Sequence, residues 1–168
     1  MCLVLILYLL FQNIKYRKLQ NSTNFLKISI YACLHIVFDS ITVYTVNHLD
    51  VVPGWFNRIC HMIFFIVSIL FTREVFCYVL NFVISDRKMG IVQKVTNGIT
   101  LLYIVTVPFM QLDYLKGNGT NYSMGVAVYV GYGTFMFYCF IAIGILVVYR
   151  KKIEPKVVHN VLPMMIIM

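Results

Sequence analysis

Charged residues are scarce in this sequence, since Asp, Glu, Lys and Arg together make up 12% of its 168 residues. A soluble domain carries about 25%. Because 61% of the residues are hydrophobic, the chain has too little polar surface to enclose an apolar core in water. The shortage of charge therefore excludes an ordinary soluble domain and indicates an integral membrane protein.

Paired cysteines and catalytic motifs are also missing. The five cysteines, at positions 2, 33, 60, 77 and 139, are odd in number and include no CxxC pair. This excludes a disulfide framework or a zinc site, and we expect the cysteines to pack as small apolar side chains. No Gly-rich phosphate loop, nucleophile with a placed base, or HExxH helix is found. No motif in the sequence predicts enzyme activity, a metal site or a cofactor for this chain.

Long apolar runs, separated by polar segments, make up most of the sequence. Those at 25–46, 56–84, 90–111 and 125–149 reach the roughly 20 residues that a helix needs to cross a hydrocarbon core. The run at 1–14 predicts a short first helix, and 157–168 predicts the start of a sixth. The segment 85–88 is expected to turn the chain back, and the polar segment 113–123 to be a loop. The predicted fold is an all-α polytopic membrane helix bundle over residues 1–168. It has five transmembrane helices, the first one short, plus the start of a sixth, and is a fragment of a longer protein.

Positive charge alternates between the polar segments, and the formal net charge is +8. The segments after the first, third and fifth runs carry four, three and four Lys or Arg residues. Those after the second and fourth carry only Arg58 and Lys116. This asymmetry places the first set in the cytoplasm and the amino terminus outside. Because the charge is distributed among apolar runs, the expected partner is the lipid bilayer of the cell membrane and not nucleic acid.

Five ionisable residues lie inside the apolar runs: His35, Asp39, His61, Arg73 and Glu74. Burying a charge at the centre of a bilayer costs about 2.5–3.5 kcal/mol, so each needs a partner, water or a function. His35 and Asp39 share a helix face because they are four residues apart. His61 is expected at a depth similar to that of Asp39. Three interpretations of this group remain open: hydrogen bonding of Asp39 to His61 or a nearby hydroxyl, sensing of a small ligand or proton, and metal binding.

Arg73 and Glu74 are adjacent in the third long run. Neighbouring residues on a helix point about 100° apart, so we expect these two not to pair with each other. Each is predicted to meet another helix or to reach the inner interface, in a static or a moving contact. Ala127 and Gly131 have the small-xxx-small spacing that lets membrane helices approach closely, which predicts a packed bundle.

Several segments together resemble a known family. They are the basic segment KYRK at 15–18, the segment IVFDSITVY at 36–44, the short loop with Pro53, and the aromatic third helix. They resemble the amino-terminal multipass sensory region of bacterial GGDEF-domain proteins, the diguanylate cyclases of Gram-positive gut anaerobes. In that family the helices precede a cytoplasmic domain that makes cyclic di-GMP. Because this chain contains no such domain, the resemblance implies an input module without cyclase activity of its own.

The leading hypothesis from the sequence is a membrane sensory module in signal transduction. A small ligand or a proton would bias the packing of the helices, and a cytoplasmic output domain would read the change. A homodimer is compatible with this hypothesis. One alternative is part of a transporter or channel, although the sequence lacks the internal repeats and matched helix breaks of many transporters. Another is a seven-helix receptor, whose charged-aromatic motif is poorly matched by SDRK at 85–88.

Overall fold

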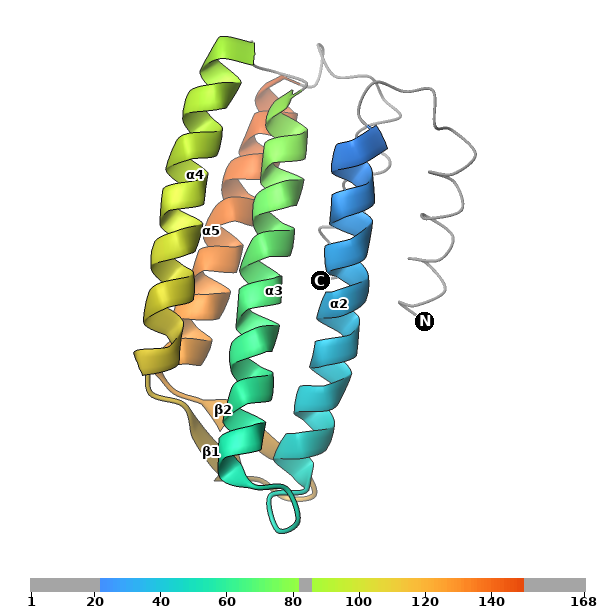
Figure 1. The fold of residues 1–168 in the computed structure, drawn as a ribbon, viewed down its shortest axis with the longest axis vertical. Coiled ribbons are helices and arrows are strands. Elements are labelled where there is room, and N and C mark those ends of the chain that lie inside the picture. Colours follow the sequence, from blue (N-terminus) through green and yellow to red (C-terminus); the bar gives the residue numbers. More distant parts are fainter. Residues whose placement is uncertain (1–21, 82–85, 150–168) are drawn as a thin grey trace.

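A computed structural model of the chain describes residues 22–81 and 86–149. Helices account for 81% of the described residues, which confirms the predicted helical class. In chain order the elements are α2 (Ser22–Asn47), α3 (Gly54–Asn81), α4 (Asp86–Thr106), the 3-10 helix η1 (Val107–Phe109), β1 (Asp113–Lys116), β2 (Asn121–Met124) and α5 (Val126–Val148) (Figure 1). The predicted first helix at 1–14 and the start of a sixth at 157–168 lie outside the described residues.

Four segments are long and apolar enough to cross a membrane: Leu26–Asn47, Gly54–Asn81, Lys88–Phe109 and Val126–Val148. Each has 22 to 28 residues, which meets the requirement of about 20 for a hydrocarbon core. Their bounds lie close to those expected from the sequence, most closely for α5, which differs from the predicted span 125–149 by one residue at each end. These four helices are compatible with a multi-pass membrane protein.

The helices run alternately up and down, and α3 lies at the centre of the bundle (Figure 1). It packs against α2, α4 and α5. In its most apolar window 61% of the residues are buried, against 17% to 22% in the other three helices. The larger apolar core includes Phe65, Ile69 and Phe76 of α3 with Tyr138 and Ala142 of α5. Residues placed on α3 can therefore contact each of the other three long helices that the structure describes.

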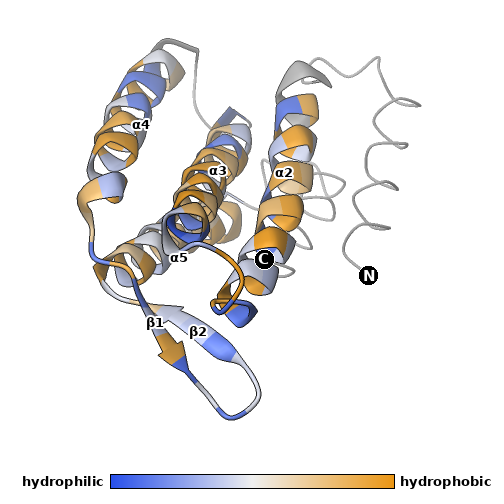
Figure 2. Cartoon of the chain, turned by 60° about the horizontal axis from the view of Figure 1, so that its bottom comes forward, coloured by the Kyte–Doolittle hydropathy of each residue, from blue (hydrophilic) through white to orange (hydrophobic). Residues whose placement is uncertain are grey.

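The outer faces of the other helices expose large apolar side chains. The exposed fractions reach 86% for Phe109, 74% for Val148 and 70% for Phe140. Figure 2 shows hydrophobic residues along the helices and polar residues at their ends and in the hairpin. Such extended apolar surface is unusual for a soluble monomer and suits contact with lipid tails.

The segment 113–123, predicted to be a loop, contains a β-hairpin instead. β1 pairs with β2 antiparallel, with Lys116 opposite Asn121. Gly119 adopts φ 94° in the turn, and a Cβ on Gly117 would lie 2.5 Å from the Thr120 carbonyl oxygen. Glycine therefore permits the tight turn. Pairing of the two strands satisfies the backbone hydrogen-bonding groups of this segment, whose polar side chains gave no sign of a strand in the sequence. The all-α description is correct for the bundle and wrong for this connection.

The ends of α4 also differ from the prediction. The helix begins at Asp86, within the segment expected to turn the chain back, and ends at Thr106. The chain continues as the 3-10 helix η1, which contains Pro108. Proline has no backbone N–H and disfavours a helical conformation in the residue before it. The α-helix therefore stops earlier than residue 111, where the apolar run ends.

Candidate functional site

The end of the bundle that holds the turn 48–53 and the β-hairpin is here called the hairpin end. A group of polar side chains lies inside it, and Thr45, Asn57, His61 and Tyr114 form what we call the hairpin-end cluster. Thr45, Asn57 and His61 are 2%, 0% and 3% exposed. Polar groups buried to this extent are costly unless they are hydrogen-bonded, so the cluster is a candidate functional site.

Asn57 is the centre of the hairpin-end cluster. Its Oδ1 accepts a hydrogen bond of 2.7 Å from the Thr45 hydroxyl, which joins α2 to α3. Its backbone carbonyl oxygen lies 2.9 Å from Nδ1 of His61. Because a carbonyl oxygen can only accept, Nδ1 carries the proton in this contact and the neutral imidazole has a free lone pair on Nε2. The cluster thus holds a buried histidine in one defined orientation.

Tyr114 of β1 covers His61 from the hairpin. The two rings meet edge to face with centroids 5.6 Å apart. Burial raises the pKa of Tyr114 above its ordinary value, while the positive charge of Arg58 acts in the opposite direction. The Tyr114 hydroxyl and Nδ2 of Asn57 are both buried, and neither makes a hydrogen bond with a described residue. Two polar groups of the cluster are therefore open to a further partner.

Hydrogen bonds join the hairpin and its flanking segments to two of the long helices, α2 and α5. The Asn121 backbone N–H donates to Oδ1 of Asn47 at 2.8 Å, and the Asn121 side-chain amide donates to the Val46 carbonyl at 2.9 Å. The Ala127 N–H, in the first turn of α5, donates to the Gln111 carbonyl at 3.1 Å. A movement of the hairpin would therefore also displace the end of α2 and the start of α5.

Arg58 makes the corresponding link between α3 and the end of α4. Its guanidinium donates to the carbonyl oxygens of Pro108 and Met110 at 3.0 and 2.9 Å. These carbonyls follow the end of a helix, where acceptors lack helical partners and a cation is favourable. Arg58 therefore stabilises the chain where it leaves α4 for the hairpin.

The structure describes no contact of His61 with His35 or Asp39, whereas Asp39 lies within electrostatic range of His35, as expected for residues four apart on one helix. His35 packs against the rings of Phe64 and Phe71, with centroid distances of 4.9 and 6.4 Å. Asp39 is exposed, and its carboxylate makes no hydrogen bond or ion pair with the residues that the structure describes. The prediction that this carboxylate accepts a hydrogen bond from a nearby hydroxyl is therefore wrong. The Thr42 hydroxyl donates instead to the backbone carbonyl oxygen of Asp39, at 2.8 Å.

Metal binding has no support from the geometry. Within residues 22–81 and 86–149, no three side chains of His, Cys, Asp or Glu gather closely enough to hold a metal ion. A small cavity between α3 and α5 offers about 10 Å³, which is about the space that one water requires. The cavity is too small for a substrate.

The prediction that Arg73 and Glu74 do not pair is wrong. Nη1 of Arg73 lies 2.6 Å from Oε1 of Glu74, and the two side chains are 17% and 13% exposed. The argument from a 100° separation considered only the directions in which the side chains leave the helix. An arginine side chain is long enough to curve around the helix surface, and an apolar environment favours pairing because little water competes.

The small residues of α5 were expected to allow close helix packing, and the structure shows such packing at Gly131. Ala127 is fully buried, and a Cβ on Gly131 would lie 3.2 Å from both the Phe65 ring and the Tyr103 hydroxyl. Close packing at Gly131 is thus confirmed. A Cβ on Gly133 would have no described neighbour within 4 Å, so that glycine is not required by packing within this bundle.

Sequence reasoning singled out His61 but missed Thr45, Asn57 and Tyr114. One signal was present: Asn57 and His61 are four residues apart on an apolar helix, the same spacing that drew attention to His35 and Asp39. Thr45 and Tyr114 could not be recognised in this way, since they come from other elements. Comparisons with protein-family models, with curated proteins and with solved structures found no match to this chain.

Proposed function

We propose that this chain is the membrane-embedded input module of a signal-transducing protein. An event at the hairpin end would change the packing of the helices, and a cytoplasmic output domain would read the change. The observation that carries the proposal is the polar network at that end, which joins the hairpin, a buried histidine and the ends of several helices. A stimulus acting there would reach the whole bundle through contacts that already exist.

Signalling requires a stimulus to have different affinities for two arrangements of the helices. The hairpin-end cluster offers a physical source for such a difference. Asn57 Nδ2 and the Tyr114 hydroxyl are buried without a described partner, and an arrangement or ligand that satisfied them would be favoured by about 1–3 kcal/mol for each group. His61 adds a group whose ordinary titration range is near physiological pH. The proposed stimulus is a proton or a small polar ligand.

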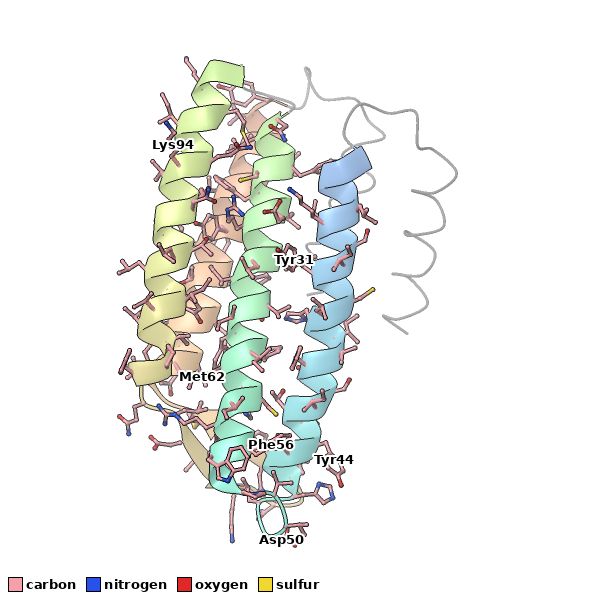
Figure 3. All side chains as sticks on the ribbon, in the orientation of Figure 1. Tyr31, Tyr44, Asp50, Phe56, Met62 and Lys94 are labelled. Atoms are coloured by element: carbon pink, nitrogen blue, oxygen red, sulfur yellow. The ribbon has the colours of Figure 1, made fainter. Side chains whose placement is uncertain are left out.

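The proposed orientation has the hairpin end and the amino terminus outside the cell, with five membrane helices and the start of a sixth. The charge distribution supports it, because the hairpin-end connections carry only Arg58 and Lys116 as cations. Asp50 lies at the hairpin end, whereas Lys94 lies toward the other end of the bundle (Figure 3). Positive charge collects on the cytoplasmic side of membrane proteins.

The resemblance to GGDEF-associated sensory regions suggests cyclic di-GMP synthesis as the output. In that proposal the diguanylate cyclase domain belongs to the full-length parent protein, and the chain described here is not itself an enzyme. It would act by positioning the last helix, to which the cytoplasmic domain is attached.

A fusion experiment tests the sensory function. The chain 1–168 would be joined to a diguanylate cyclase domain, and cellular cyclic di-GMP measured at equal amounts of membrane-inserted protein. We expect His61→Gln to change cyclic di-GMP severalfold and to remove any response to external pH. The matched control is His48→Gln, because His48 is exposed at the same end, where its ring stacks on Tyr44 and its Nδ1 lies 2.8 Å from the Tyr44 carbonyl oxygen. Equal output from wild type and both variants at every pH would contradict the proposal.

A further inference from the structure

The outer surface of α4 carries two amide side chains. Gln93 and Asn97 are four residues apart, so they share one face of the helix, and both are exposed. Within residues 22–81 and 86–149, neither side chain has a hydrogen-bond or ion-pair partner. α4 stands at an edge of the bundle (Figure 1), and among the long helices it packs mainly against α3. The two amides therefore lie on a surface that the described bundle leaves uncovered.

The depth of this surface in a bilayer keeps water away from it. α4 contributes most of the candidate membrane span Lys88–Phe109. Asn97 follows Lys88 by nine residues, which is about 14 Å along the helix and about half of a hydrocarbon core of about 30 Å. Lipid tails neither donate nor accept hydrogen bonds, so an amide at this depth is costly unless a protein group satisfies it. Asn97 therefore needs a partner beyond the described bundle.

The residues in line with the two amides are suited to packing against another helix. We call Gly90, Gln93, Asn97, Leu101 and Ile104 the α4 seam, because their spacing of three or four residues keeps them on one side of the helix. Leu101 is 63% exposed. A Cβ on Gly90 would have no described neighbour within 4 Å, so packing inside the bundle does not require this glycine. A glycine on an open face lets a second membrane helix approach closely.

An amide is complementary to a copy of itself, since its NH2 group donates and its carbonyl oxygen accepts. In a dimer whose two-fold axis is perpendicular to the membrane, each residue lies at the same depth as its copy. The exposed carboxylate of Asp39 on α2 lacks this complementarity, because two like charges repel each other. Lys94 lies beside the α4 seam, and its long side chain can carry the ammonium toward the polar boundary near Lys88. Self-association is therefore favoured through α4 over α2.

The apolar runs outside the described residues contain no matching amide for the bilayer centre. In the run 1–14, Gln12 and Asn13 stand within three residues of Lys15. In the run 157–168, His159 and Asn160 stand within four residues of Lys156. Basic residues mark the polar boundary of a membrane span, and the rest of each run has no amide, imidazole or charged side chain. A second copy of α4, by contrast, supplies an amide at the required depth.

We propose that two copies of this chain associate in parallel through the α4 seam, with the side chain of Asn97 hydrogen-bonded to Asn97 of the second copy. Gln93, one turn away, makes a second contact of the same kind. A single asparagine in a helix interface fixes the register and number of helices in coiled coils, and amides join helices within membranes. The interface does not depend on the proposed sensory function, since a transporter or scaffold could associate through the same surface.

Energy transfer between donor-labelled and acceptor-labelled copies of the full chain, in lipid bilayers at several ratios of protein to lipid, would measure the association. We expect a dimer whose dissociation constant rises about tenfold in Asn97→Leu, the effect of losing hydrogen bonds between membrane helices. Gln93→Leu should weaken the dimer in the same direction. Leucine favours insertion into the bilayer, so both variants should remain membrane-spanning. The matched control Ile99→Ala alters a different face of α4 and should leave the dissociation constant unchanged.

Disulfide crosslinking in membranes would locate the interface. After oxidation with copper phenanthroline, Asn97→Cys and Leu101→Cys should give covalent dimers above the background that the native cysteines produce in the wild-type chain. Ile99→Cys should not exceed that background. A monomer at every ratio of protein to lipid would overturn the proposal and leave the two amides to a different membrane protein. Unchanged association in both leucine variants, or stronger crosslinking by Ile99→Cys than by Asn97→Cys, would also overturn it.

Discussion

The hydroxyl of Thr45 donates a 2.7 Å hydrogen bond to Oδ1 of Asn57, across the interface of α2 and α3 and inside the apolar part of the bundle. Both residues are almost fully buried. The bond therefore joins two helices at the point where the chain turns between them, next to the buried His61. It is the contact through which α2 is linked to the rest of the hairpin-end cluster.

Thr45→Val should destabilise the protein by about 1–2 kcal/mol, because it leaves Oδ1 of Asn57 buried without its donor. The free energy of unfolding in detergent would be measured by denaturant titration. Thr134→Val is the matched control, since the Thr134 hydroxyl donates only to the carbonyl of Val130 within its own helix. Equal losses in the two variants would show that the interhelical bond contributes nothing specific.

The helices could be predicted from the sequence because the bilayer requires apolar runs of a fixed minimum length. The hairpin could not, since its short strands DYLK and NYSM lack the regular alternation of apolar and polar residues that indicates strands, and its pairing depends on backbone conformation at glycine. The hairpin-end cluster was only partly predictable. His61 is conspicuous in an apolar helix, but the approach of Thr45 and Tyr114 depends on how the helices pack and where the hairpin folds. The Arg73 to Glu74 pair was missed because spacing describes Cα positions and not the reach of a long side chain.

Asn121→Ala should loosen the hairpin, because its side-chain amide donates to the Val46 carbonyl at the end of α2. The loss of one partly buried hydrogen bond is worth about 1 kcal/mol, so amide exchange over residues 113–124 should accelerate about fivefold. Hydrogen exchange followed by mass spectrometry measures this. Asn118→Ala, at the exposed tip of the same hairpin, should leave the exchange unchanged. A similar acceleration in both variants would mean that Asn121 does not fasten the hairpin.

Gly125→Ala should be among the most damaging small substitutions. Gly125 has φ 116°, and an added Cβ would lie 2.6 Å from the Gln111 carbonyl oxygen, which accepts the Ala127 hydrogen bond. We expect a loss of about 2 kcal/mol or more in the free energy of unfolding. Gly133→Ala is the matched control, because its Cβ would enter open space within a helix, where alanine is favoured by about 0.5–1 kcal/mol. The free energy of unfolding should therefore fall in Gly125→Ala and rise in Gly133→Ala. A loss of stability in both variants would contradict the packing described for these two glycines.

Tyr114 should contribute to the pH dependence of stability in the alkaline range. Burial raises its pKa in the folded state above the unfolded value of 10.0. The unfolded chain then loses the phenolic proton first, so this contribution is fully present below pH 10 and is lost as the pH rises through the folded pKa. Tyr114→Phe should reduce the loss of stability above pH 10 in denaturant titrations at several pH values. An unchanged slope would show that Tyr114 ionises equally in both states.

The ion pair between Arg73 and Glu74 can be separated into its parts by a double-mutant cycle. Glu74→Gln leaves the charge of Arg73 unpaired in an apolar environment. Arg73→Gln likewise leaves the carboxylate of Glu74 unpaired, with the same kind of desolvation cost. Because both side chains retain some exposure, each single change should cost about 1–3 kcal/mol, below the 3–5 kcal/mol typical of fully buried pairs. The double variant should cost less than the sum of the single variants, since neither charge remains unpaired. Additive losses in the free energy of unfolding would show that the two charges are solvated independently by the bilayer interface and that their 2.6 Å contact does not stabilise the fold.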